Sequence, residues 1–291
     1  MKLKILRILL ALILVFTAAG VGAETSVWVV KSPKSTVYLA GSCHVLRSSD
    51  HPLPAEFFSA YQDARKIIFE APLGDMEKPE YLEKLIRAAT YSDGTTLKQH
   101  LSSQAYSKVE AFCRERNYPI EQFQSFRPWM LAMTLTMFEM ASIGAESNNG
   151  VDYFFHGKAR NDQKMTGSLE TVDQQIGFLT LMDAGMSNEQ ITETINELKQ
   201  IKTKGPEILK AWKNGDEAKI EALNLQELKE YPKLYQSLII DRNKKWINDI
   251  EGYLNSSVNT MVIVGVAHLA GDNSVVDLLR KLGYKVVKLQ K

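Results

Sequence analysis

The sequence has few cysteines and little excess charge, and these two shortages exclude whole classes of protein. Cys43 and Cys113 are its two cysteines in 291 residues, too few for a small scaffold held together by disulfides. Its 35 basic and 34 acidic residues nearly balance, unlike the basic surface of a nucleic-acid-binding protein. We therefore expect an ordinary hydrophobic core and no nucleic-acid partner. A free, buried Cys43 is favoured over a disulfide, because an unpaired cysteine usually packs as a small apolar residue.

Long hydrophobic runs are also missing, except at the start of the chain. Three basic residues within the first seven precede an unbroken apolar run, Ile8 to Phe16, and small residues follow up to Ala23. This order predicts a signal peptide, residues 1–23, and an exported protein that is periplasmic or secreted. An uncleaved membrane anchor is the alternative, but the run is shorter than the roughly 20 residues that span a bilayer. Cleavage would leave residues 24–291 as a single domain with 32 basic and 34 acidic residues and no stable membrane insertion.

Strand patterns occur at both ends of the chain, and helical patterns lie between them. Two β-rich runs, 26–30 and 36–40, flank a turn that contains Pro33 and predict an antiparallel hairpin. A helix from Pro54 to about Ala64 then leads into a buried strand over 66–70, an order that favours a parallel sheet. The other expected strands are 164–167, 260–264 and 284–289. The predicted fold class is therefore mixed α/β, with a central mixed sheet built from both chain ends. A large helical insert occupies roughly 78–161, and further helices occupy 171–253.

Two tetrapeptides share one design, in which an apolar strand ends in Gly-x-x-His. They are Gly41-Ser42-Cys43-His44 and Gly265-Val266-Ala267-His268. Ligands of open α/β sheets bind beyond the carboxyl ends of the strands, so both histidines are expected at one edge. Glu70 ends a third strand in the same sense, and a carboxylate is costly to bury without a partner. A single Gly-x-x-His is more often a simple turn. Two copies beside a strand-end glutamate predict a shared site.

His44, Glu70 and His268 are of the residue types that bind a divalent metal ion. Imidazole and carboxylate suit zinc, manganese, cobalt or iron, and three protein ligands leave a position for water. A metal-free version is also coherent, with one histidine as general base and Glu70 orienting it. The remaining histidines lack this context, and we interpret them as structural: His51, His100 and His156.

Other polar residues lie where the helical insert would fold back onto the same edge of the sheet. Arg127 begins a long helix, Asp152 opens another, and Gln174 lies one turn beyond Glu170, which follows a strand. We predict that these four residues bind substrate, although each one alone is more often a cap or a solvated residue. Arg242 and Asn243 lie inside a long helix, where asparagine is a poor helix former.

Taken in order, these segments resemble the TraB/GumN family, which is related to the TIKI metalloproteases. The resemblance rests on segments spread over nearly all of residues 24–291: Tyr38 to His44, His51 to Pro54, Ile67 to Glu70, Arg127-Pro128-Trp129, Gly150-Val151-Asp152, Ser168 to Thr171 with Gln174, Asp241-Arg242-Asn243, and Gly265 to His268. It implies a mixed α/β core with a helical insert and a divalent metal ion, such as manganese, cobalt or zinc. The implied catalytic and metal-binding residues are His44, Glu70 and His268, with Arg242 and Asn243 as further catalytic residues. Ser42-Cys43 replaces the family's usual threonine and apolar residue, but Ser42 keeps the hydroxyl.

The leading prediction is an exported, metal-dependent hydrolase that is peptidase-like and acts on a peptide or small molecule. One alternative is a periplasmic binding protein that sequesters its ligand, since binding needs a cleft but no water-activating centre. The other is a metal-independent hydrolase that uses His44 and Glu70. The residues leave the substrate, the metal and the oligomeric state open.

Overall fold

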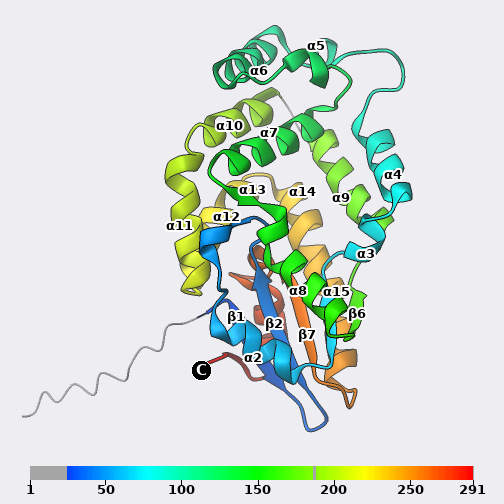
Figure 1. The fold of residues 1–291 in the computed structure, drawn as a ribbon, viewed down its shortest axis with the longest axis vertical. Coiled ribbons are helices and arrows are strands. Elements are labelled where there is room, and N and C mark those ends of the chain that lie inside the picture. Colours follow the sequence, from blue (N-terminus) through cyan, green and yellow to red (C-terminus); the bar gives the residue numbers. More distant parts are fainter. Residues whose placement is uncertain (1–24, 186–187, 291) are drawn as a thin grey trace, which may run out of the picture.

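A computed structural model describes residues 25–185 and 188–290, and Figure 1 shows a sheet flanked by helices, with further helices stacked beyond one end of it. The predicted signal peptide, residues 1–23, lies outside the described residues. None of the helices in the described ranges combines the length and the apolar character needed to cross a membrane.

The main sheet is mixed and has six strands in the described part of the chain, in the order β6-β4-β7-β2-β1-β8. Their bounds are β1 Val27–Lys31, β2 Thr36–Ser42, β4 Lys66–Phe69, β6 Met165–Ser168, β7 Thr260–Gly265 and β8 Val286–Lys288. β6, β4, β7 and β2 are parallel, whereas β1 runs antiparallel to β2 and β8 runs antiparallel to β1. The predicted mixed sheet built from both chain ends is confirmed. Two short strands, β3 Leu46–Arg47 and β5 Ala145–Glu146, form a separate antiparallel pair.

Neighbouring strands in the sheet are not consecutive in the sequence. β2 and β4 flank the first helix in sequence, yet β7, almost two hundred residues later, lies between them. In the register, Leu39 pairs with Val262 and Ile67 pairs with Met261. Because these three strands are parallel, the two Gly-x-x-His motifs and Glu70 leave the sheet side by side at its carboxyl edge.

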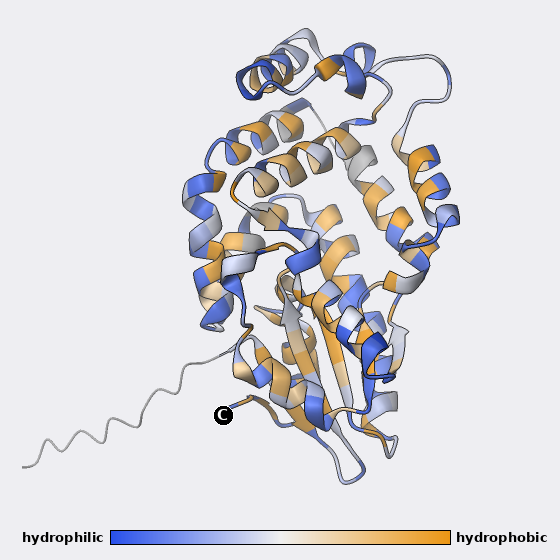
Figure 2. Ribbon diagram, in the orientation of Figure 1, coloured by the Kyte–Doolittle hydropathy of each residue, from blue (hydrophilic) through white to orange (hydrophobic). Residues whose placement is uncertain are grey.

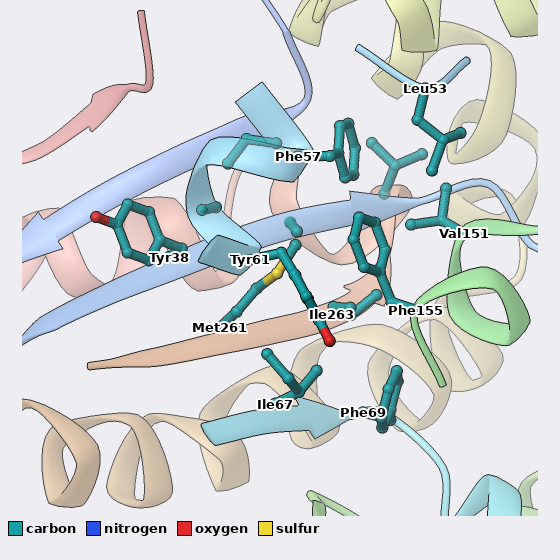
Figure 3. Close-up of a cluster of buried hydrophobic side chains, with 14 of the residues drawn as sticks. Tyr38, Leu53, Phe57, Tyr61, Ile67, Phe69, Val151, Phe155, Met261 and Ile263 are labelled. Atoms are coloured by element: carbon teal, nitrogen blue, oxygen red, sulfur yellow. The ribbon is translucent and has the colours of Figure 1, made fainter. Parts of the chain in front are cut away.

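Alternate residues of each strand point to opposite faces, so the sheet has two hydrophobic cores. One face packs against α2 Ala55–Asp63, α8 Val151–Asn161 and α11 Ile201–Lys213, and Figure 3 shows Phe57, Tyr61 and Phe155 from the first two of these helices above the strands. The other face packs against α15 Asp241–Leu254 and α16 Val275–Lys281. In Figure 2 the central strand β7 is strongly apolar, as expected for a strand covered on both faces.

The middle of the chain is helical, as predicted, and most of it forms a layer beyond the carboxyl edge of the sheet (Figure 1). The helices are α3 Leu73–Met76, α4 Pro79–Ala89, α5 Leu97–His100, α6 Ser103–Arg116, α7 Pro128–Ser142, α9 Val172–Gly185, α10 Asn188–Leu198, α12 Glu217–Asn224 and α13 Gln226–Lys229. A third apolar cluster holds α5, α6, α7 and α10 together. Cys113 lies in that cluster and Cys43 near the sheet, and both cysteines are free thiols.

One predicted helix is interrupted. The pattern over 231–253 indicates a single helix, but α14 Pro232–Tyr235 and α15 are joined by a π-helical turn, Gln236–Ile240. Such turns are rare and occur often at functional sites. Arg242 is the second residue of α15, directly after this turn.

Candidate functional site

Close backbone packing brings the two Gly-x-x-His motifs together. Ser42 pairs with Gly265 across β2 and β7, and the backbone N–H of Glu70 donates to the carbonyl of Ile263 at 2.9 Å. A Cβ atom at Gly265 would lie 2.9 Å from Nε2 of His44 and 3.4 Å from Oε2 of Glu70. Glycine therefore leaves the space in which the His44 ring and the Glu70 carboxylate approach each other.

The first motif is held in place by the Gly150-Val151-Asp152 segment at the start of α8. A Cβ atom at Gly150 would overlap the carbonyl oxygen of His44, and the N–H of Val151 donates to the carbonyl of Cys43 at 3.1 Å. The buried carboxylate of Asp152 then accepts hydrogen bonds from the Ser42 hydroxyl and, at 2.8 Å, from Nδ1 of His44.

The Asp152 carboxylate also favours the protonated form of His44. The negative charge of Asp152 raises the pKa of His44 to about 9, although the side chain is 58% exposed and water screens part of the attraction. Because Nδ1 faces Asp152, Nε2 is the ring nitrogen that faces Gly265 and Glu70.

The second motif has an equivalent support on α15. Nδ1 of the buried His268 lies 2.7 Å from Oδ1 of Asn243, and Nδ2 of Asn243 donates to the carbonyl of Asn273 at 2.9 Å. That second bond assigns Oδ1 as the acceptor, so His268 carries its proton on Nδ1. Its Nε2 is left with a lone pair 4.0 Å from Oε1 of Glu70. Burial lowers the pKa of His268 to about 3, which keeps the ring neutral.

Glu70 lies between the two histidines and has two hydrogen-bond donors. The N–H of Gly265 donates to Oε2 at 2.8 Å, and Nη2 of Arg242 donates to Oε1 at 2.5 Å. Burial alone would raise the pKa of Glu70, but the positive charges of Arg242 and His44 and the N–H of Gly265 lower it to about 2. The carboxylate therefore stays ionised across the physiological range.

Arg242 joins Glu70 to a second buried carboxylate. Its Nε and Nη2 donate to the two oxygens of Glu170 at 2.7 and 2.8 Å, and Nη1 lies 3.3 Å from Nε2 of His268. Nη1 also donates to the carbonyl of Leu238, in the π-helical turn, at 3.2 Å. Glu170 accepts a further bond from Nε1 of Trp246 at 3.0 Å, and burial raises its pKa above the ordinary value.

Nearly the whole chain also matches known sequences. A sequence profile of the TraB/PrgY/gumN family matches residues 26–288. The chain belongs to the TraB/PrgY/gumN family. The resemblance predicted from the motifs is thereby confirmed.

The TraB/PrgY/gumN relatives are distant in sequence. The uncharacterized protein YbaP of Escherichia coli is 21% identical over 246 residues, which cover 84% of this chain and 87% of YbaP, and YbaP of Shigella flexneri gives the same values. Metalloprotease TIKI2 of Danio rerio is 23% identical over 316 residues, which cover 89% of this chain and 60% of TIKI2. No solved structure matches the chain.

The four predicted substrate-binding residues occupy different places in this TraB/PrgY/gumN fold. Asp152 and Glu170 belong to the cluster, where they support His44 and Arg242. Gln174 accepts a bond from the N–H of Thr171 at 2.9 Å at the start of α9 and lines a cleft beside Arg242. Arg127 begins α7 in the helical layer, where its guanidinium lies 5.0 Å from the Tyr91 ring. Their contacts with substrate stay predictions.

The other histidines make structural contacts. His51 lies 2.8 Å from the carbonyl of Asn149 and packs on Phe154, His100 stacks on Tyr91, and His156 packs edge-on against Phe69.

Sequence reasoning missed Trp246, whose indole binds Glu170 and packs beside His268. Its spacing was a usable signal, because Trp246 lies one helical turn after Arg242 and therefore on the same face of α15.

His44, Glu70 and His268 are of the residue types that bind a metal ion, but their side chains do not surround one common point. In the described ranges, no group of three or more His, Cys, Asp or Glu side chains is spaced to hold a metal ion. The Arg242 guanidinium contacts both Glu70 and His268, so a positive charge already lies beside these two side chains. Both histidines nevertheless present Nε2 toward Glu70, with Nδ1 fixed by a side-chain oxygen, as metal-binding histidines usually do.

Proposed function

We propose that this protein is an exported, metal-dependent hydrolase that cleaves peptide bonds. The observation that carries the proposal is the matched support of the two histidines. Asp152 holds Nδ1 of His44 and Asn243 holds Nδ1 of His268, so both Nε2 atoms face the ionised carboxylate of Glu70. The similarity to Metalloprotease TIKI2 supports the same chemistry.

In this proposal His44, Glu70 and His268 hold a divalent ion such as manganese, cobalt or zinc. When bound, the ion would polarise the scissile carbonyl and lower the pKa of a water molecule. Asp152 and Asn243 orient the two rings, and Arg242 keeps Glu70 ionised and ties it to Glu170.

Elemental analysis and peptide digestion test the metal-dependent form. Purified protein should retain about one divalent ion per chain and cleave a peptide library, read by mass spectrometry. His44→Ala and His268→Ala should lose both the ion and cleavage. His100→Ala, which changes an exposed surface contact with Tyr91, should keep both. Chelation should stop cleavage, and added manganese, cobalt or zinc should restore it. Full cleavage by metal-free protein would overturn the metal-dependent form.

One observation favours a metal-independent hydrolase as the second candidate. The Arg242 guanidinium already places a positive charge against Glu70 and 3.3 Å from His268. The pKa values of the two histidines count against this candidate, because a general base works best with a pKa near the operating pH, and that of His44 is about 9 and that of His268 about 3. Cleavage that survives exhaustive chelation would select it. Ligand binding without cleavage under every metal tested would instead select the binding protein.

Export is tested separately. Sequencing the amino terminus of protein from the periplasm or the medium should give Glu24 as the first residue, since the predicted cleavage follows Ala23. Protein that keeps residues 1–23 and stays with the membrane would support an uncleaved anchor.

A further inference from the structure

Two clefts flank the ion pair between Glu170 and Arg242, and α9 borders both of them. The first, of about 540 Å³, is lined by Glu170 and by charged residues that include Lys78, Lys84 and Asp173. The second, of about 470 Å³, is mainly apolar and has Arg242 in its wall. A substrate that crosses the ion pair would therefore meet a polar surface on one side and an apolar one on the other.

The apolar cleft is built from two helical segments that meet beside the cluster. Gly177, Phe178 and Leu181 of α9 form one wall. The other wall is polar and consists of Ser237 in the π-helical turn and the charged residues Asp241, Arg242 and Lys245 of α15.

Two contacts link this cleft to the reacting groups. The guanidinium of Arg242 lies over the Phe178 ring at 4.6 Å, while the same guanidinium binds Glu70. The cleft therefore begins one side chain away from the carboxylate that lies between the two histidines.

The cleft has room for an added side chain. A Cβ atom at Gly177 would have no neighbour within 4 Å, whereas the glycines of the two motifs are closely packed. Leu181 is 41% exposed although it is a large apolar residue. Open space beside exposed apolar surface is typical of a site that binds an apolar group.

From these features we infer that the apolar cleft is a specificity subsite, which receives a bulky apolar side chain of the peptide substrate next to the bond that is cleaved. Gly177, Phe178 and Leu181 determine the preference, and Arg242 fixes the subsite relative to Glu70. This inference rests on the proposed peptidase function for its substrate class, but the subsite itself can be tested by binding alone.

The test uses N-acetyl amino-acid N-methylamides as probes. Their binding to the full mature protein is measured by ligand-observed NMR titration, and mass spectrometry afterwards checks whether each probe is intact. The leucine and phenylalanine probes should bind roughly tenfold more tightly than the alanine probe, the order expected for partial burial of one apolar side chain.

Filling the cleft should remove this preference. Gly177→Leu adds a side chain in the open space and should reduce the tenfold preference to about twofold or less. Gly252→Leu is the control, because Gly252 is also a helical glycine with no neighbour within 4 Å of an added Cβ and lies outside the cleft. It should keep the preference in full. Leu181→Ser removes apolar surface without adding bulk and should also weaken the preference for the leucine and phenylalanine probes.

The subsite is overturned if wild type binds the three probes equally, or if Gly177→Leu and Leu181→Ser leave the preference unchanged. The proposed function fails in a different way. Apolar preference that follows the expected pattern while no peptide is cleaved, with or without metal, would support the subsite and overturn the hydrolase.

Discussion

Replacing Arg242 with methionine should destabilise the protein by about 3–5 kcal/mol, the cost of leaving a buried charge without its partner. The Arg242 side chain is 10% exposed, and it pairs with Glu170, which is 1% exposed, and with Glu70, which is 14% exposed. Methionine keeps much of the apolar stem, so the loss comes mainly from the two carboxylates.

Urea unfolding at pH 7, followed by circular dichroism, measures this loss. Lys244→Met is the control, since it removes an exposed positive charge from the same helix and should change the free energy of unfolding by no more than about 0.5 kcal/mol. Adding Glu170→Gln to Arg242→Met should recover part of the stability, because one unpaired charge is then removed. A loss below about 1 kcal/mol for Arg242→Met would show that Arg242 does not balance these carboxylates.

The stability difference between wild type and Arg242→Met should depend on pH in a defined direction. In the wild type the pKa of Glu70, about 2, lies below its ordinary value of 4.5. Glu70 therefore contributes stability that is present above pH 4.5 and is lost as the pH falls toward 2. Without Arg242 the pKa values of Glu70 and Glu170 should rise, so folding of the variant would take up protons. The gap in stability between wild type and variant should narrow as the pH falls from 7 to 5. A gap that widens would refute the reasoning.

Three further substitutions test the supports of the two histidines. Gly150→Ala should lower the free energy of unfolding by about 1–3 kcal/mol, since its Cβ would overlap the His44 carbonyl. Thermal unfolding measures this loss, and Gly157→Ala, at an open helical position, is the control that should show little change. Asp152→Asn should lower the pKa of His44 from about 9 toward 6.5, seen by NMR titration of its ring, and an unchanged pKa would exclude Asp152 as the cause. Asn243→Ala should cost about 1–3 kcal/mol by leaving Nδ1 of His268 unpaired, and urea unfolding unaffected by the change would contradict that role.

The location of the site could be predicted because each of its central residues follows a strand. The apolar runs before Gly41, Glu70 and Gly265 indicate buried parallel strands, and parallel strands place their ends at one edge. That reasoning does not need the strand order. It works even though β7 lies between β2 and β4, which the local sequence does not reveal.

The contacts within the site could not be predicted in the same way. Whether Asp152 touches substrate or His44 depends on how α8 docks, and that docking is set by the close approach of Gly150 to the His44 backbone. The position of Arg242 depends on a π-helical turn that the helical pattern over 231–253 does not indicate. Both are tertiary effects, which residue patterns along one segment do not encode.

The charges at the sheet edge are consistent with the metal ion that the proposed function requires. Asp152 is matched by His44, whose raised pKa favours the protonated ring. Arg242 is the one positive side chain shared by Glu70 and Glu170, and His268 beside them is neutral. With both glutamates ionised, that group keeps a surplus negative charge in a mostly buried setting, where unbalanced charge is unfavourable. Arg242 holds Glu170 through both Nε and Nη2 but reaches Glu70 through Nη2 alone, so Glu70 is the carboxylate that can turn toward a cation while Glu170 retains the arginine.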